Sequence, residues 1–363
     1  MPLYMDLHIV PGVNAKDVAD AHSRDVYLQK DHNCTCLTYW VDEQKGQVFC
    51  LIDAPSKEVV YELHTKSHGL IPHKIIEVEP DLVRSFLGRI TDPENAQLTD
   101  NGLLLIDEPS FRIMMMIGLP DQLLIRYQQG AVAEHKLQKF ILRINEQIVD
   151  RGGRIALQTK EGVIGSFKSA REALLTASDI YALLTDKLPY SIALHAGEPV
   201  ARHDHFFGDA LATLQYLCFF EQKFPIRITN IVRESLLDER ELIPEIPICI
   251  LSASDEKLIG HIISIIEGRY KEPGLQLDDF AKSLALSHSQ LYRKMMAITG
   301  FSPNDFLRSF RLEKAKQQLQ KGVRHIADVA FENGFNSPSY FTKCFKERFG
   351  LTPHEYCSLL LIS

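Results

Sequence analysis

The sequence predicts a multidomain α+β protein in three parts: a βαββαβ unit over residues 1–80, a mixed α/β part over residues 81–255 and an all-α part over residues 256–363. Three observations lead to this prediction. A chain of 363 residues is longer than a single hydrophobic core usually organises. Strand-type and helix-type apolar patterns alternate in the first two parts, and only helix-type patterns occur in the third.

Composition and cysteine content indicate the compartment. The 45% apolar and 24% charged residues are typical of globular proteins, and no apolar run reaches the roughly 18 residues of a membrane span. Met1 to Val10 lack the basic flank of a signal peptide. The seven cysteines are odd in number and irregularly spaced, which argues against a disulfide framework. We therefore expect a cytoplasmic protein with no membrane partner.

The net charge of −7 is unevenly distributed. Residues 256–363 contain fifteen lysines and arginines against eleven acidic residues, so this part carries +4 and the remainder carries −11. A basic part joined to acidic parts is typical of a phosphate-binding module attached to domains with other ligands.

The first part has the pattern of a ferredoxin-like split βαβ unit. A short connection suited to a hairpin separates the second and third strands, and Gly69 is a helix stop. The expected elements are strands Tyr4–Val10, Cys34–Val41, Gln47–Asp53 and Lys74–Val78, and helices Asn14–Lys30 and Ser56–His68.

Six of the fourteen histidines lie in this first part. His64 and His68 are four residues apart, which places both imidazoles on one helix face and allows them to share a metal ion. His22 lies on the other helix and His8 on the first strand, and Cys50 could add a thiolate. Neutral imidazoles select nickel, zinc, copper or cobalt over magnesium or calcium. The alternative is that these histidines are unrelated surface or half-buried residues.

The middle part alternates helices and strands. Helical apolar spacing covers Ala133–Val149 and Ala170–Leu184. A hairpin is expected over Arg154–Phe167, turning near Glu161, and an apolar strand over Ser191–His195.

The last part contains two similar halves, each with a helix, a turn and a second helix. Ser287 and Ser337 are the expected N-caps of the two second helices, and Gly334 permits the turn of the second half. Apolar residues form the back of each second helix, and polar residues lie near its start. Pro303–Leu319 reads as one connecting helix. A rigid apolar back with a polar front is what a helix in the DNA major groove requires, although a plain helical bundle shares this spacing.

The run from Ile326 to Tyr356 closely resembles the signature of the AraC/XylS family of transcription regulators, and Leu284 to Phe301 resembles its first reader helix. The resemblance implies two helix-turn-helix units in successive major grooves of double-stranded DNA, and a homodimer. The residues expected to contact base edges are Ser289, Tyr292, Arg293, Ser339, Tyr340 and Lys343. Arg293 suits guanine, because a guanidinium binds O6 and N7 together. Lys346 and Arg308 are expected to contact phosphate.

The first part also resembles a small ferredoxin-like family with nickel-binding members. The residues that carry this resemblance are Met5–Gly12, Leu37–Trp40, Val48–Leu51, Ala54–Ser56 and His64–Gly69. The resemblance implies a transition-metal site, with nickel favoured, formed by His8, His22, His64 and His68.

Residues from about Ala133 to Leu236 resemble the class III nucleotide cyclase homology domain, through Gly152-Gly153-Arg154 and the runs Glu161–Phe167, Ile192–Glu198 and Phe207–Leu214. The chemistry departs from that family. The strand expected to supply the first metal-binding aspartate, Phe111–Ile117, has none, and Glu161 stands at the second position. Ala212 and Tyr216 occupy the positions of the asparagine and arginine that stabilise phosphoryl transfer. A catalytically degenerate domain is expected, so we expect a protein that is not an enzyme.

These observations favour a transcription regulator in which residues 1–80 bind metal, residues 81–255 couple or dimerise, and residues 256–363 bind DNA. Three alternatives remain open at this point. The effector could be a small organic ligand in the middle part, the protein could be an active cyclase fused to a DNA-binding domain, or it could store metal.

Overall fold

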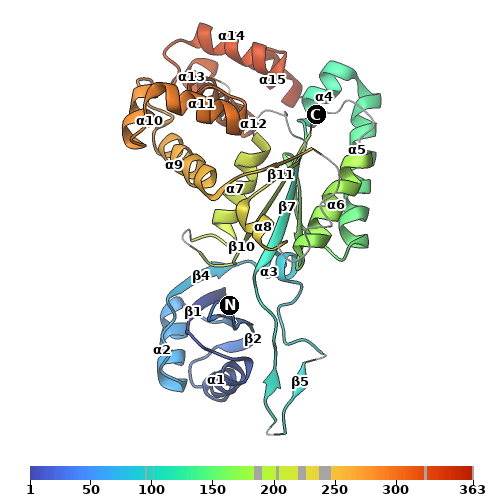
Figure 1. The fold of residues 1–363 in the computed structure, drawn as a ribbon. Helices are drawn as coiled ribbons and strands as arrows, with labels where there is room; N and C mark the ends of the chain where they lie inside the picture. Colours follow the sequence, from blue (N-terminus) through green and yellow to red (C-terminus); the bar gives the residue numbers. More distant parts are fainter. Residues whose placement is uncertain are drawn as a thin grey trace.

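The structure, a computed structural model, describes the whole chain apart from residues 95, 101, 184–189, 202–203, 220–225, 237–246, 323–324 and 362–363. Figure 1 shows an N-terminal α/β unit, a central sheet flanked by helices, and a C-terminal lobe of helices at the opposite end from the N-terminus. None of the described helices combines the length and apolar character needed to cross a membrane.

The N-terminal unit contains six elements in the order βαββαβ, each within two residues of its predicted range. They are β1 (Leu3–Ile9), α1 (Ala15–Leu28), β2 (Thr35–Asp42), β3 (Gln47–Asp53), α2 (Lys57–Ser67) and β4 (Lys74–Val78). The strands pair antiparallel in the order β2-β3-β1-β4. Asn14 caps α1 by accepting a hydrogen bond from the Asp17 amide at 3.0 Å.

The two faces of this sheet bury different residues, because side chains alternate along a strand. On β1, Leu3, Met5 and Leu7 face the apolar core that continues into the central sheet. Tyr4 instead joins the core beneath α1 and α2, and Asp6 and His8 share its side of the strand by alternation. The polar residues of β1 are therefore enclosed by the two helices.

The segment after β4 contacts both the central sheet, through its helix, and the N-terminal unit, through its hairpin. It contains α3 (Pro80–Leu87) and a small hairpin of β5 (Gln97–Leu98) and β6 (Leu104–Leu105). The Tyr39 hydroxyl donates to the Leu104 carbonyl at 2.8 Å and accepts from the Ile106 amide at 3.1 Å. This segment falls in the predicted middle part, yet it contributes to the packing of the first.

The central unit is a six-stranded sheet in the order β12-β11-β10-β7-β9-β8. Helices α5, α6 and α8 cover one face, and α3 and α7 cover the other. The predicted helices, hairpin and strand are all present, with residue 184 of the second predicted helix outside the described residues. The elements are β7 (Arg112–Gly118), α4 (Gln122–Gln129), α5 (Ala131–Asp150), β8 (Arg154–Thr159), β9 (Gly162–Phe167), α6 (Ala170–Leu183), β10 (Ser191–Gly197), α7 (Gly208–Phe219), β11 (Ile226–Ile228), α8 (Asn230–Glu234) and β12 (Ile248–Ile250).

The C-terminal lobe consists of helices throughout its described length, as predicted. They are α9 (Ala253–Arg269), α10 (Leu277–Ser283), α11 (His288–Thr299), α12 (Pro303–Gln320), α13 (Ile326–Glu332), α14 (Pro338–Phe349) and α15 (Pro353–Leu360). The first half shares a core with the central sheet, where Phe219 packs against Phe301 and Phe306. The second half has its own core, built on Phe341, Phe345 and Phe349 at every fourth position of α14.

The turn between α13 and α14 requires glycine. Gly334 has φ +78°, and a Cβ there would lie 2.3 Å from the Tyr270 carbonyl oxygen. Gly322 offers a matched control, because its φ is +93° but nothing lies within 4 Å of its Cβ position. Both Gly→Ala changes incur the left-handed penalty of about 1 to 2 kcal/mol, and only Gly334→Ala adds a clash. In urea denaturation, Gly334→Ala should therefore lower the free energy of unfolding more than Gly322→Ala, and equal losses would contradict this packing.

Candidate functional site

The histidines of β1 and α2 come together beneath the helices of the N-terminal unit. The ring centroids of His8 and His64 are 4.8 Å apart, those of His64 and His68 are 5.0 Å apart, and those of His8 and His68 are 6.0 Å apart. His64 is fully buried, and His8 is 4% exposed. Three of the four predicted ligands therefore form one compact cluster.

Two carboxylates complete this cluster. Asp6 Oδ2 lies 2.9 Å from His64 Nε2, on the other side of the ring from Asp25 Oδ2, which lies 3.3 Å from His64 Nδ1. Asp25 Oδ2 is also 3.4 Å from His68 Nε2. The Ser67 hydroxyl donates to the other carboxylate oxygen of Asp25. Both carboxylates are buried, so each depends on these partners for compensation.

The electrostatics of the cluster follow from this pairing. Burial alone would lower the pKa of His64, but the carboxylates of Asp6 and Asp25 raise it to about 10. Burial also opposes ionisation of Asp6, yet His64 and His8 hold the pKa of this carboxyl well below its usual range. Without a metal, the cluster therefore pairs a cationic imidazole with two buried carboxylates.

The donor set fits a transition-metal ion. One group of donor atoms within 4.8 Å of one another comes from Asp6, His8, Cys50 and His64, and another comes from Asp25, His64 and His68. His8 Nε2 is buried and makes no hydrogen bond with the described residues, although Asp6 Oδ1 is 3.2 Å away. Burial and Asp6 raise the pKa of the Cys50 thiol, so the imidazoles are the readier donors. A cavity of about 210 Å³ next to the cluster is lined by His8, His22, Cys50 and His68.

His22 lies beside this cluster and belongs to neither group of donor atoms. Its ring is 5.1 Å from that of Tyr39, and burial lowers its pKa despite the nearby Asp92 and Asp25. His22 does face the cavity that His8 and His68 also line. It can therefore reach a ligand in the cavity more readily than an ion held by His64.

The sequence contained an unused signal for the two carboxylates. Asp6 precedes His8 by two residues and so shares its face of β1, and it pairs across the sheet with Cys50. Asp25 follows His22 by three residues on α1, which places it on the same helix face.

The eight predicted DNA-contacting residues lie on accessible parts of the C-terminal lobe. On α11, Ser289 and Arg293 are exposed and Tyr292 is 48% exposed, while Leu291 and Met295 are buried behind them. Ser287 caps this helix by accepting from the Gln290 amide at 3.2 Å. The side of α11 that faces solvent is thus polar near its N-terminus.

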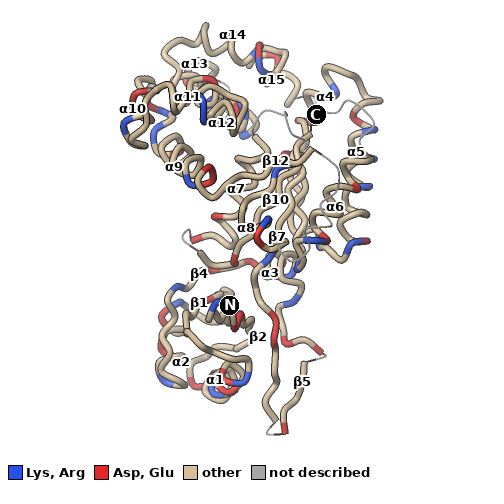
Figure 2. Tube along the Cα trace, in the orientation of Figure 1, with Lys and Arg blue, Asp and Glu red and all other residues tan. Residues whose placement is uncertain are grey.

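The second half repeats this arrangement on α14. Ser337 caps the helix, accepting from the Tyr340 amide at 3.3 Å, and Pro338 occupies its first turn. Ser339, Tyr340, Lys343 and Lys346 are exposed, opposite the buried phenylalanines. Figure 2 shows that basic and acidic residues both occur along the helices of this lobe.

Arg308 lies on α12 between the two halves and is half-exposed. Its Nη2 donates to Asp305 Oδ1 at 2.6 Å. Partial burial lowers the pKa of Arg308, but a hydrogen bond to Tyr340 and the charge of Asp305 raise it above its ordinary value. The hydrogen bond to Asp305 thus holds the Arg308 guanidinium along its own helix.

Comparison with known proteins gives family matches for the N-terminal and the C-terminal regions of the chain. Residues 280–358 match the family described as "Helix-turn-helix domain", and residues 4–78 match "Nickel responsive protein SCO4226-like". The chain therefore contains an AraC-type helix-turn-helix domain in its C-terminal region and an SCO4226-like domain at its N-terminus. These two matches lie outside the middle part, whose cyclase resemblance stays a prediction.

Three relatives illustrate these matches. "Histidine kinase P4" of Formosa agariphila is 32% identical over 145 residues, which is 38% of this chain and 10% of the relative. "HTH-type transcriptional activator RhaS" of Mannheimia succiniciproducens is 32% identical over 84 residues, 23% of this chain and 31% of the relative. The crystal structure of SCO4226 from Streptomyces coelicolor is 31% identical, with 21% of this chain and 94% of that chain covered and a TM-score of 0.20. The chain thus spans a third or less of these two curated relatives.

Proposed function

We propose that the protein is a transcription regulator that binds double-stranded DNA through α11 and α14 and responds to a transition metal in its N-terminal domain. The observation that carries the DNA-binding proposal is the pair of capped helices, each with a buried apolar back and an exposed polar front, within an AraC-type domain. Ser289, Tyr292, Arg293, Ser339, Tyr340 and Lys343 would contact bases, and Arg308 and Lys346 would contact phosphates.

The domain boundaries proposed are residues 1–80, 81–255 and 256–363. The sheet order β2-β3-β1-β4 supports a ferredoxin-like N-terminal domain. Glu161, Ala212 and Tyr216 stand where a nucleotide cyclase needs other side chains, which supports a middle domain that has lost catalysis and is used for coupling or dimerisation.

The metal proposal rests on the cluster of imidazoles and carboxylates. His8, His64 and His68 would supply nitrogen donors, Asp6 and Asp25 would orient them or bind directly, and His22 would contribute from the cavity. Imidazole donors suit nickel, zinc, cobalt and copper, and the match to a nickel-responsive family favours nickel.

Direct contacts link the N-terminal domain to the central sheet. Lys45 Nζ lies 2.8 Å from Glu198 Oε1, and Lys74 Nζ donates to the Ala201 carbonyl at 2.8 Å. Tyr39, whose ring lies next to that of His22, is also hydrogen-bonded to the segment that leads into β7. Metal binding can therefore bias the arrangement of the domains, and so the affinity of the two reader helices for DNA.

The DNA-binding part of the proposal is tested by selecting duplexes from a random-sequence library with the full-length protein. We expect enrichment of two short conserved blocks about one helical turn apart, because two linked reader helices enter successive major grooves. Tyr292→Ala should weaken selection of one block and Tyr340→Ala selection of the other. Enrichment of no sequence by the wild-type protein would contradict DNA reading.

A further inference from the structure

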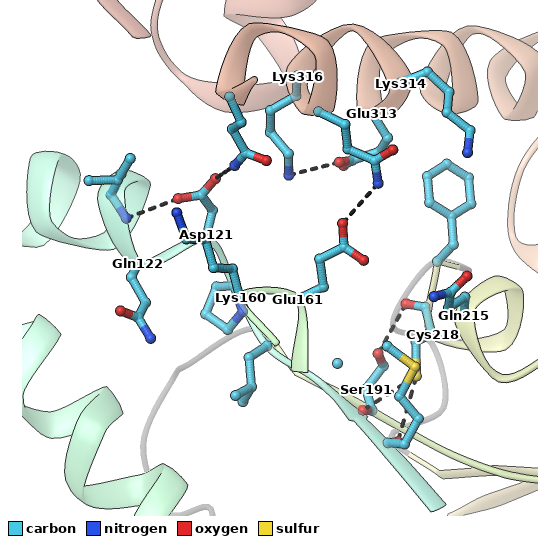
Figure 3. Close-up of a pocket in the computed structure, with 18 of the residues that line it drawn as sticks. Asp121, Gln122, Lys160, Glu161, Ser191, Gln215, Cys218, Glu313, Lys314 and Lys316 are labelled. Atoms are coloured by element: carbon cyan, nitrogen blue, oxygen red, sulfur yellow. Dashed lines mark hydrogen bonds and ion pairs between the residues drawn. The ribbon is translucent and has the colours of Figure 1, made fainter. Parts of the chain in front are cut away.

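A cavity of about 620 Å³ lies between the central sheet and the C-terminal lobe. Figure 3 shows its walls: the end of β7 and the β8–β9 turn on one side, and α12 on the other. Its floor includes Ser191, whose hydroxyl donates to the Cys218 carbonyl at 3.0 Å. Phe219 at the end of α7 and Phe310 of α12 add aromatic rings to the lining. This volume is within the range of organic-ligand sites, about 300 to 1,000 Å³.

The carboxylates of this cavity already have partners. Asp121 Oδ2 accepts from the Tyr356 hydroxyl at 2.8 Å and from Gln320 Nε2 at 3.2 Å. Glu161 accepts from Gln317 Nε2 at 2.8 Å, and Glu267 accepts from the Tyr216 hydroxyl. The two remaining acids are ion-paired, Glu313 with Lys316 and Glu134 with Arg126. Each of these carboxylates therefore has at least one partner.

Two lysines of the wall differ from these acids. Among the described residues, neither Lys160 nor Lys314 has a carboxylate within ion-pair distance, and neither donates a hydrogen bond that would occupy its ammonium. Lys314 Nζ lies over the Phe310 ring, 5.1 Å from its centroid. Lys160 approaches from the β8–β9 turn and Lys314 from α12 (Figure 3). The cavity therefore offers a ligand two ammonium donors, one on each wall, beside aromatic rings.

We infer that this cavity is a binding site for a small organic anion, with its carboxylate or phosphate oxygens at Lys160 and Lys314 and its flat apolar body against Phe219 and Phe310. This site is separate from the proposed metal site, and only its regulatory use rests on the proposed DNA-binding function. The ligand would contact both the central sheet and the helix that joins the two reader units.

The position of the cavity gives such a ligand influence over the lobe. Gln317 and Gln320 of α12 are hydrogen-bonded across the cavity to Glu161 and Asp121. A ligand that bridges Lys160 and Lys314 would hold the same two walls together through stronger, charge-assisted contacts. Its binding is therefore coupled to how α12 is seated on the central sheet.

Isothermal calorimetry on the full-length protein tests the inference with four probes: 2-naphthoate, naphthyl phosphate, the neutral 2-naphthamide and inorganic phosphate. We expect one of the two aromatic anions to bind one-to-one and more tightly than both other probes, and the preferred one identifies the anionic group. Lys160→Met/Lys314→Met should weaken that binding at least about tenfold, because the change removes both charge-assisted contacts to the anion. Lys139→Met, an exposed lysine on α5 outside the cavity, should leave it unchanged.

Two results would overturn the inference: no binding of either aromatic anion at millimolar concentration, or equal binding by wild type and the double variant. Nickel titration and binding to the selected duplex are measured on the same proteins. Their failure in the wild type would refute the proposed function and leave an observed anion site standing.

Discussion

Replacing His64 with alanine is expected to abolish tight nickel binding and to lower the free energy of unfolding of the metal-free protein by about 3 to 5 kcal/mol. His64 contributes to both groups of candidate metal donors. It is also the buried partner of both Asp6 and Asp25, so its removal takes an imidazole from each buried carboxylate and leaves only His8 beside Asp6 and His68 beside Asp25. Calorimetric titration of nickel and urea denaturation of the stripped protein measure the two effects.

His135→Ala provides the control for this experiment. His135 is exposed on α5, outside the N-terminal unit, and its replacement should change neither quantity. The same metal affinity in His64→Ala as in the wild type would show that the cluster is a structural ion-pair network and not a metal site.

Replacing Arg293 with alanine is expected to reduce affinity for the preferred sequence by about 1 to 3 kcal/mol and to relax specificity at one base position. Arg293 is exposed near the start of α11, and its Nε makes only a 3.3 Å contact with the Ser289 carbonyl within its own helix. Its guanidinium therefore remains able to bind two acceptors on guanine. Competition binding with single-base variants of the selected duplex locates the position.

Lys346→Ala distinguishes base reading from phosphate contact. Lys346 is exposed on the flank of α14, and its loss should weaken all sequences alike and reduce the salt dependence of binding by about one unit of slope. Uniform weakening in Arg293→Ala as well would assign Arg293 to the backbone and contradict its proposed role.

The secondary structure could be predicted wherever an apolar pattern was strong. The N-terminal strands show alternating apolar residues and the helices show helical apolar spacing. In α14, phenylalanines recur at every fourth position. The hairpin of β5 and β6 could not be predicted, because each strand has two residues and both residues of β5 are exposed. Its place against Tyr39 depends on tertiary contact with a residue some 65 positions away in the sequence.

The candidate metal site could be predicted only where its residues follow a local pattern in the sequence. The spacing of His64 and His68 is local to one helix and identifies them directly. The contribution of Asp25 depends on α1 packing beside α2, which no local pattern specifies. The cavity between the central sheet and the C-terminal lobe is harder still to predict, because it depends on contacts between distant parts of the sequence. Asp121 and Tyr356, which are hydrogen-bonded at this cavity, are separated by 235 residues. The sequence identifies many of the individual residues, but it does not specify the long-range packing that brings them together.

The most direct test of metal-responsive DNA binding compares the affinity of the full-length protein for its selected duplex in the nickel-loaded and metal-stripped forms. We expect at least about a fivefold difference, which is the lower end of typical coupling between sites, and no difference in His64→Ala. Equal affinity of the two wild-type forms, with nickel shown to be bound, would contradict the proposal that the N-terminal domain controls the reader helices.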